Sequence, residues 1–561
     1  MKLKASLSLF LITSILTSQS TLGKSSYEKM LVPQKGGTFV DSISITPVSL
    51  NPLLATNMDD QLVCGYFYMS LMGRDGQTYE DLPGLAEKVE ISKDKKEYTF
   101  TLNKNAKWSD GTPVTSDDVE FTFNKMMDTK VEAAALRSFM SGVSFQKLET
   151  LKFKFIVAVP KYNSLSSLTT FTPVQKKQFE KEADFNKSRE NLHPIGNGAY
   201  KLKTISRDQF VTLERVTDWW AKDLPDYRAT NNFDVIQLKI IGDPALRYEN
   251  LLKGNIDTLS FMADQYATQV EGVDKEKFGK NANSGKTLWA DKFPSDGALP
   301  WYGLGLNQKN PILSSLKVRQ ALAYLIDYDA VTERAYFKTV YQSVSPFGSH
   351  TDNVPPELKN GANRYKLDPK KAAALLQEDG WADSNKDGVL DKIINGKNTP
   401  LRLEVKLYSS NSAAMKAVQI FKETFKKAGI ELVLRPMDGT ALYKDFDDKN
   451  FDVIYMGWGG GSIYPDPKQN WHTDSIANGG SNTVSYSNPK VDKMINEANL
   501  EFDKKKRSKL LQGINRELYH DLPYIFLVER GYILQGLNSK LKSPVWNQRY
   551  GITVAKDLFH F

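Results

Sequence analysis

Residues 401–434 read LRLEVKLYSSNSAAMKAVQIFKETFKKAGIELVL, and this stretch decides the fold class. Leucine or valine occupies every second position over 401–407, which predicts a half-buried strand. Apolar residues at helical spacing predict a helix over 414–428, which ends at Gly429. Alternation at 430–434 predicts a second strand. A strand, a helix and a strand at this spacing indicate a right-handed crossover and a sheet covered by helices.

Similar patterns recur along the chain. Residues 451–456 (FDVIYM) predict a short buried strand, and 317–326 predict a helix with one apolar face. The alternating run 98–102 (YTFTL) predicts another strand. Thr115 and Asp118 have the spacing of a capping box, which predicts that a helix begins there. There is no internal repeat, so we expect an α/β protein with added antiparallel parts in at least two lobes.

The N-terminus has the order of a secretory signal peptide. Lys2 and Lys4 precede an apolar stretch over 5–17, and small and polar residues follow up to Gly23. The apolar stretch is shorter than the ~20 residues that span a bilayer. A lipoprotein needs a cysteine directly after its leader, whereas the only cysteine is Cys64. We therefore expect residues 1–23 to be cleaved and the mature protein to lie free in the periplasm.

Composition excludes several classes of protein. One cysteine among 561 residues rules out an intramolecular disulfide. A content of 40% hydrophobic and 11% aromatic residues argues against disorder. The net charge of +8 is spread over 74 basic and 66 acidic residues, without the basic stripe typical of nucleic-acid binding. We expect no nucleic-acid partner.

No catalytic or cofactor motif stands out from the rest of the sequence. The five histidines are not at metal-ligand spacing, and no G-x-S-x-G sequence occurs. Residues 279–287 (GKNANSGKT) resemble a phosphate-binding loop, but five residues instead of four separate its glycines. The sequence therefore predicts a protein with no cofactor and no catalytic residues, which is not an enzyme.

An acidic turn is a weak candidate for calcium. It places oxygen ligands at alternating positions around a glycine, but Ile394 stands where a bidentate acid is expected. An ordinary Asp/Asn/Gly turn is the favoured interpretation, and calcium is the alternative. The candidate ligands are Asp383, Asn385, Asp387 and Asp391.

The segment 457–471 (GWGGGSIYPDPKQNW) is the candidate ligand site. It brings aromatic side chains, bare backbone and a carboxylate together just after a predicted strand. Loops at the carboxyl ends of strands are where open α/β sheets bind ligands. A purely structural turn is the alternative. The predicted ligand-binding residues are Trp458, Gly460, Gly461, Ser462, Tyr464, Asp466 and Trp471.

Two neighbouring stretches carry a resemblance to a known family. Residues 98–102 (YTFTL) and 106–119 (AKWSDGTPVTSDDV) resemble the signature of the family 5 extracellular solute-binding proteins. This family includes the dipeptide, oligopeptide and nickel binding subunits of bacterial ABC importers. Residues 194–200 (PIGNGAY) and 318–327 (VRQALAYLID) are similar to further segments of it. Residues 219–225 (WWAKDLP) look most like the branch of oligopeptide and microcin C carriers.

The resemblance implies a two-lobed periplasmic binding protein of type II, in the large three-part variant, with a hinge and a ligand cleft between the lobes. Lobe I is expected to combine 24–60, 195–290 and 525–561, with 61–194 as its insertion subdomain. Lobe II is expected over 291–524.

The function implied is that of a transport receptor. The protein would capture peptides or oligopeptides in the cleft and deliver them to the transmembrane permease subunits of an ABC importer, as a monomer. Another solute on the same scaffold, such as nickel, haem or an oligosaccharide, is the alternative. A secreted hydrolase is a second alternative.

One departure from the family pattern concerns the ligand site. In peptide-binding relatives an aspartate shortly after the Gly-Trp pair holds the amino terminus of the peptide. Glycines 459–461 occupy that stretch here, which is two residues longer before Pro467. Either Asp466 supplies the missing carboxylate or the amine is held elsewhere.

Overall fold

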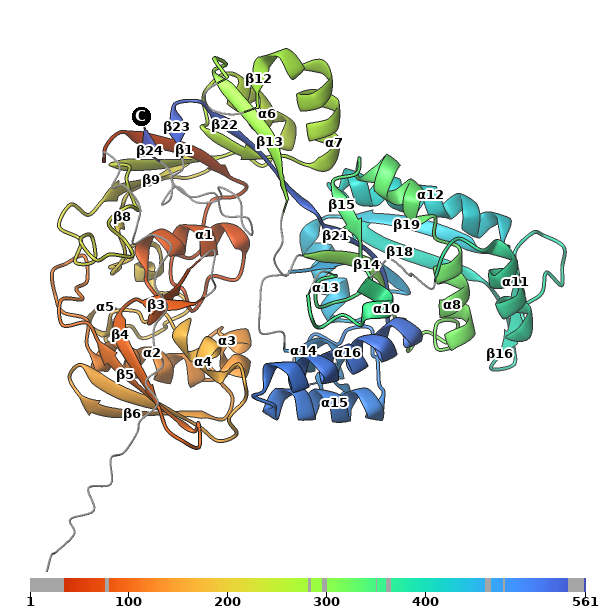
Figure 1. Ribbon diagram of the computed structural model, residues 1–561, viewed down its shortest axis with the longest axis horizontal. Helices are drawn as coiled ribbons and strands as arrows, with labels where there is room; N and C mark the ends of the chain where they lie inside the picture. Colours follow the sequence, from red (N-terminus) through yellow and green to blue (C-terminus); the bar gives the residue numbers. More distant parts are fainter. Residues whose placement is uncertain are drawn as a thin grey trace, which may run out of the picture.

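The computed structural model describes residues 35–75, 80–280, 284–294, 300–349, 351–359, 365–459, 466–477, 480–542 and 559–560. The predicted signal peptide, residues 1–23, lies outside them. Figure 1 shows two bodies side by side, which we call the first and second lobes. Among the described residues, no helix has both the length and the apolar character needed to cross a membrane.

The first lobe contains two four-stranded sheets. One has the order β1-β10-β9-β8, in which β1 and β10 are parallel. The other has the order β11-β22-β13-β12 and includes a strand from near the C-terminus. The strands are β1 (Thr38–Ile43), β8 (Tyr200–Ser206), β9 (Phe210–Arg215), β10 (Val235–Ile240), β11 (Thr258–Ser260), β12 (Phe278–Gly279), β13 (Leu288–Pro294) and β22 (Tyr532–Asn538). Helices α6 (Pro244–Leu252) and α7 (Ala263–Gln265) and the helical turns Tyr266–Val273 and Lys275–Lys277 lie beside the second sheet, with β23 (Leu541–Lys542) paired to β24 (Phe559–His560).

The part of the first lobe between β1 and β8, which we call the insertion, carries its own antiparallel sheet of order β4-β5-β7-β6. Phenylalanines on this sheet and on the helix over it pack with ring centres 5.4–6.0 Å apart. Its elements are β2 (Met72–Arg74), β3 (Asp81–Pro83), β4 (Ala86–Ile91), β5 (Glu97–Leu102), β6 (Val143–Glu149), β7 (Lys152–Val157), α2 (Ser116–Met127), α3 (Ala134–Phe139), α4 (Ser164–Thr169), α5 (Lys176–Phe179) and the turn Arg189–Leu192; α1 (Met58–Phe67) leads into it.

The predicted capping box is confirmed at the start of α2. The carboxylate of Asp118 accepts a hydrogen bond from the backbone N–H of Thr115 at 2.9 Å. The same buried carboxylate also accepts from the indole of Trp108 and from the backbone N–H of Lys176. Asp118 therefore connects the segment 106–119 to the first residue of α5 by hydrogen bonds.

The second lobe contains a six-stranded sheet of order β15-β21-β14-β20-β18-β19. The predicted strand, helix and strand over 401–434 are confirmed as β18, α12 and β19, and the two strands are parallel. The predicted strand over 451–456 is β20, and the predicted helix over 317–326 is α8. The strands are β14 (Trp301–Leu306), β15 (Val340–Gln342), β18 (Arg402–Tyr408), β19 (Glu431–Met437), β20 (Val453–Trp458) and β21 (Tyr524–Arg530), with a separate hairpin of β16 (Asp391–Ile394) and β17 (Lys397–Pro400).

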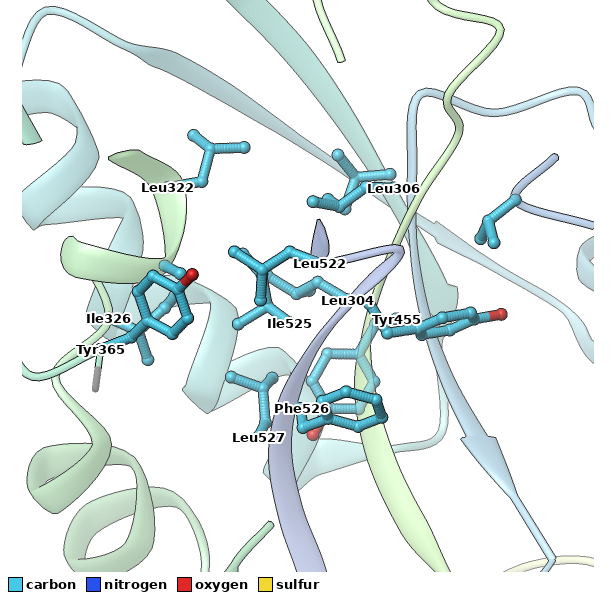
Figure 2. Packing of buried hydrophobic residues seen from close by; sticks show 14 of the residues in the cluster. Leu304, Leu306, Leu322, Ile326, Tyr365, Tyr455, Leu522, Ile525, Phe526 and Leu527 are labelled. Carbon is cyan, nitrogen blue, oxygen red and sulfur yellow. The ribbon is translucent and has the colours of Figure 1, made fainter. Parts of the chain in front are cut away.

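Helices cover this sheet and bury its core. Figure 2 shows Leu304, Leu322 and Ile525 meeting between β14, α8 and β21. The helices are α8 (Leu316–Tyr324), α9 (Tyr328–Ala330), α10 (Pro356–Lys359), α11 (Pro369–Glu378), α12 (Ser412–Lys427), α13 (Gly439–Asp447), α14 (Lys468–Trp471), α15 (Pro489–Leu500) and α16 (Lys504–Asp521), with the turns Val331–Ala335 and Thr473–Ile476.

The chain passes between the lobes twice, from β13 to β14 and from β21 to β22, as Figure 1 shows. Gly531 alone separates β21 from β22. The two crossings are bonded to each other, because the N–H of Arg530 donates to the carbonyl of Pro300 at 3.0 Å. Since β21 pairs in the second lobe, a boundary near Gly531 fits the sheets better than the predicted one after residue 524.

The segment 194–200 (PIGNGAY) holds the insertion against the first lobe by close backbone approach. A Cβ atom at Gly196 would lie 2.1 Å from the carbonyl oxygen of Phe67, and one at Gly198 would lie 2.6 Å from that of Tyr66. Only glycine fits at these two positions, because the end of α1 passes directly over them.

Candidate functional site

A groove with a volume of about 480 Å³ lies between the insertion and the second lobe. We call it the groove. Residues that are far apart in the sequence form its two walls. The insertion contributes Phe139, Met140, Ser141, Gly142, Val143, Val157, Ala158, Val159, Lys161, Asn163, Ser164, Ser167 and Leu168, and the second lobe contributes Asp466, Lys468, Gln469, Asp474, Ser475, Ala477 and Gly480.

The insertion wall is held by local hydrogen bonds. The chain leaves α3 at Phe139 and enters β6, and it leaves β7 at Val157 and enters α4. The hydroxyl of Ser164 accepts a hydrogen bond from the N–H of Lys161 at 2.9 Å, and that of Ser167 donates to the carbonyl of Asn163 at 3.2 Å. The phenyl ring of Phe139 remains 58% exposed. This wall therefore presents one exposed aromatic ring beside a row of small and polar groups.

The second-lobe wall is built on α14 and the turn that follows it. The carboxylate of Asp466 accepts from the N–H of Lys468 at 2.9 Å and so begins α14. The hydroxyl of Ser475 donates to the carbonyl of Lys468 at 2.8 Å. With Asp466, Asp474 and Lys468 on this wall and Lys161 on the other, the groove carries charges of both signs.

The two walls are joined at one end of the groove. The N–H of Tyr162 donates to the carbonyl of Asn499 at 3.1 Å, and Arg507 stacks over the Tyr162 ring. The ammonium of Lys95 lies 3.5 Å from the centre of the Phe502 ring. The side-chain amide of Asn499 also donates to Asp466, at 3.3 Å. The candidate ligand loop is therefore connected to the contact between the lobes.

A second contact joins the lobes on the side of α7 and α12, which face each other in Figure 1. The hydroxyl of Ser412 donates to the carboxylate of Asp264 at 2.6 Å. The lobes therefore contact each other on two sides.

Trp458 is the last residue of β20. It pairs with Trp301 of β14, and its ring contacts Phe446 with centres 5.8 Å apart. Its indole nitrogen lies buried beside the hydroxyl groups of Thr483 and Tyr524, although no pair among the three has hydrogen-bond geometry. Burial raises the pKa of Tyr524 to about 12.

Trp471, another predicted ligand residue, lies buried among aromatic side chains. Its indole is 2% exposed and stacks on Trp301 with ring centres 6.3 Å apart. It also meets the ring of Tyr524 edge to face at 5.7 Å. This position favours a packing role for Trp471 over contact with a ligand.

The other predicted ligand-binding residues fall into two groups, one described by the structure and one outside the described residues. Asp466 lines the groove and is exposed. Gly460, Gly461, Ser462 and Tyr464 lie outside the described residues, so their ligand contacts stay a prediction.

The acidic turn at 383–391 uses its oxygens within the chain. Asp383 accepts hydrogen bonds from the N–H groups of Asp387 and Gly388, and Asp387 accepts from Val389. Asp391 accepts from the N–H and the hydroxyl of Ser384. In the part of the chain that the structure describes, no group of three or more His, Cys, Asp or Glu side chains could hold a metal ion. These bonds favour the plain turn over a calcium loop.

The insertion wall of the groove was not predicted from the sequence. Residues 139–143 and 161–168 have no local pattern that distinguishes a ligand wall from any other surface turn. The one available signal is a phenylalanine and a methionine, at 139 and 140, directly before a glycine turn.

Comparisons with known proteins agree with this architecture. Residues 82–481 match the family described as bacterial extracellular solute-binding proteins, family 5 Middle. The chain is 28% identical over 512 residues to the oligopeptide-binding protein AppA of Bacillus subtilis, covering 88% of this chain and 86% of AppA.

Solved structures share the fold. AppA from Bacillus subtilis in complex with a nonapeptide superposes with a TM-score of 0.79 at 24% identity, over 94% of this chain and 100% of AppA. NikZ from Campylobacter jejuni in complex with Ni(L-His) superposes with a TM-score of 0.74 at 22% identity, over 92% of this chain and 96% of NikZ. With its two α/β lobes, its two crossings and a family match over most of its length, this chain belongs to the family 5 bacterial extracellular solute-binding proteins.

Proposed function

We propose that this protein is the periplasmic receptor of an ABC importer, which captures peptides between its lobes and delivers them to the permease subunits. The observation that carries the proposal is the groove, whose two walls come from different lobes and carry carboxylates and ammonium groups. A peptide has a free amine and a free carboxylate, so it meets complementary charges there. The similarity to a protein named for oligopeptide binding supports the same ligand class.

Binding would act on the equilibrium between open and closed lobes. A ligand that contacts both walls binds the closed form better, and it shifts the population by that difference in affinity. An extended peptide presents N–H and C=O groups that a backbone can pair with in strand fashion, while side chains enter pockets. The importer would then recognise the closed form.

We further propose that residues 1–23 are cleaved, that the mature chain is a monomer in the periplasm and that it does not turn its ligand over. Mass spectrometry of the mature N-terminus tests the cleavage. A chain that keeps Met1, or one that carries lipid, would contradict the periplasmic location.

Thermal denaturation with peptides tests the ligand class. A ligand that binds only the folded state raises the melting temperature. We expect peptides to raise it and to be recovered intact by chromatography of the same mixture. Recovery of cleaved peptide would support a hydrolase instead.

A metal chelate is the second candidate ligand, because the fold is shared with a protein solved with Ni(L-His) and the acid that holds a peptide amine in relatives is missing from the glycine run. If nickel with histidine raises the melting temperature and no peptide does, the peptide assignment fails and the receptor assignment remains.

A further inference from the structure

A second cavity, of about 110 Å³, opens beside the groove on the insertion. We call it the apolar pocket. It shares Phe139, Met140 and Ser167 with the groove, so the two spaces adjoin at these residues. Its lining residues are Pro52, Leu53, Met126, Leu136, Phe139, Met140, Ser167, Thr170, Phe171 and Thr172.

The walls of the apolar pocket come from hydrophobic side chains. Leu53, Met126 and Phe171 are buried behind it. Its hydroxyl groups already donate within the chain, because Ser167 donates to the carbonyl of Asn163, Thr170 to that of Ser167 and Thr172 to that of Thr170. No charged side chain of the described residues lines it. A charged group that entered the apolar pocket would lose its water and meet no opposite charge.

Its size matches one amino-acid side chain. A cavity of about 150 Å³ lined by apolar side chains holds a benzene molecule, so the smaller apolar pocket can take the side chain of leucine or methionine. Two of its lining residues are methionines, whose flexible side chains adapt to irregular shapes. Phe139, at the junction with the groove, is a large exposed apolar side chain that a ligand would cover.

We propose that the apolar pocket receives one apolar side chain of the peptide bound in the groove and makes the protein select peptides with such a residue at one position. This inference rests on the proposed function, since it requires a peptide in the groove. Leucine and methionine are the side chains that the cavity fits, and lysine or glutamate at that position would be buried without an opposite charge.

Calorimetry with a set of alanine pentapeptides tests the selection. In each peptide one alanine is replaced by leucine, or by lysine, at one of the five positions. Burying the extra carbons of leucine predicts a dissociation constant about tenfold to fiftyfold lower than that of penta-alanine, at a single position. Lysine at that position should weaken binding. Equal effects of leucine at every position would overturn the inference while leaving peptide binding in place.

A pair of variants tests whether the preference for leucine arises in the apolar pocket. Leu136→Trp places a large ring in the apolar pocket, and Leu148→Trp makes the same change at an exposed leucine on β6 of the insertion. We expect the leucine-to-alanine affinity ratio to fall to about threefold or less in Leu136→Trp and to stay at its original value in Leu148→Trp. An unchanged ratio in a folded Leu136→Trp protein contradicts the inference. If that variant does not fold, Thr170→Phe, at an exposed lining residue, makes the same test. Failure of every pentapeptide to bind would overturn the proposed function and this inference together.

Discussion

The guanidinium of Arg507 lies 4.0 Å from the centre of the Tyr162 ring and joins the second lobe to the insertion. Arg507 is on α16 and is also held by the carbonyl of Glu501, to which it donates at 2.9 Å. Tyr162 is connected in turn to Asn499, which contacts Asp466 in the groove. The contact between the lobes and the candidate ligand site therefore form one continuous set of interactions.

Arg507→Ala should loosen the contact between the lobes. A cation stacked on an aromatic ring contributes about 0.5–1 kcal/mol at an exposed site, so we expect ligand affinity to fall roughly twofold to fivefold. Small-angle scattering of the liganded protein should show a larger mean radius of gyration. Lys505→Ala, at an exposed position on the same helix, is the control. If the two variants have the same ligand affinity and the same radius of gyration, Arg507 does not contribute to the contact between the lobes.

Asp466→Asn should separate a charge contact with the ligand from a role in the loop. Asparagine can still accept the hydrogen bond from the N–H of Lys468, so α14 keeps its start. A hydrogen bond to a charged group contributes about 1.5–3 kcal/mol, so a free-amine peptide should bind roughly tenfold to a hundredfold more weakly. An N-acetylated peptide should bind weakly to the original protein and lose little more in the variant.

The control for this substitution is Glu497→Gln, at an exposed carboxylate of α15 that does not line the groove. Calorimetry measures the affinity of each variant for the free-amine peptide and for the N-acetylated peptide. If both peptides weaken alike and the melting temperature falls, Asp466 serves only the turn. An unchanged affinity for the free-amine peptide would show that Asp466 does not contact the ligand.

Asp118→Ala should destabilise the insertion more than the neighbouring Asp117→Ala. The Asp118 carboxylate accepts from three donors, a buried one from Trp108 and partly buried ones from Thr115 and Lys176. Leaving such donors unpaired costs about 1–3 kcal/mol each, so a loss of about 3 kcal/mol in unfolding free energy is expected. Asp117 makes one exposed ion pair with Lys147, of a kind that contributes about 1 kcal/mol or less. Urea denaturation compares the two, and equal midpoints would contradict the structural role of Asp118.

Asp41 should make the protein less stable as the pH rises toward neutral. Burial raises the pKa of this carboxyl on β1 to about 7, and Asp257 adds to the rise while Ser42 and Arg247 oppose it. In the unfolded chain an aspartate has a pKa of about 3.9. The folded state therefore keeps a proton that the unfolded state has lost, and this contribution to stability declines from about pH 4 to about pH 7.

Asp41→Asn removes that titration. As the pH rises from 5 to 8, the free energy of unfolding of the variant should increase by about 1–3 kcal/mol relative to that of the original protein. Melting curves at the two pH values measure it. Parallel pH dependence in the two proteins would show that Asp41 is already ionised when folded.

Local patterns predicted the secondary structure well and the site only in part. The alternation over 401–407 and the helical stripe over 414–428 lie within one segment, and β18 and α12 appear there. The capping box at Thr115 and Asp118 is likewise a short-range feature. Each depends on residues within a few positions of one another, which is why the sequence alone reveals it.

The groove depends on contacts that no local pattern contains. Asp466 and Phe139 line it together only because the lobes contact each other. Trp471 shows the same dependence: an aromatic residue in a glycine-rich segment suggests ligand contact, and in the structure its ring packs on Trp301 and Tyr524. Whether an aromatic ring faces a groove or a core is decided by distant strands, here β14 and β21.

Peptide binding in the groove is tested by mass spectrometry of the small molecule that is released when the protein, purified from the periplasm of cells that make it, is unfolded. We expect peptides, in a total amount near one per protein chain, with leucine or methionine enriched at one position. A metal chelate, a haem or an oligosaccharide in place of peptides would contradict it.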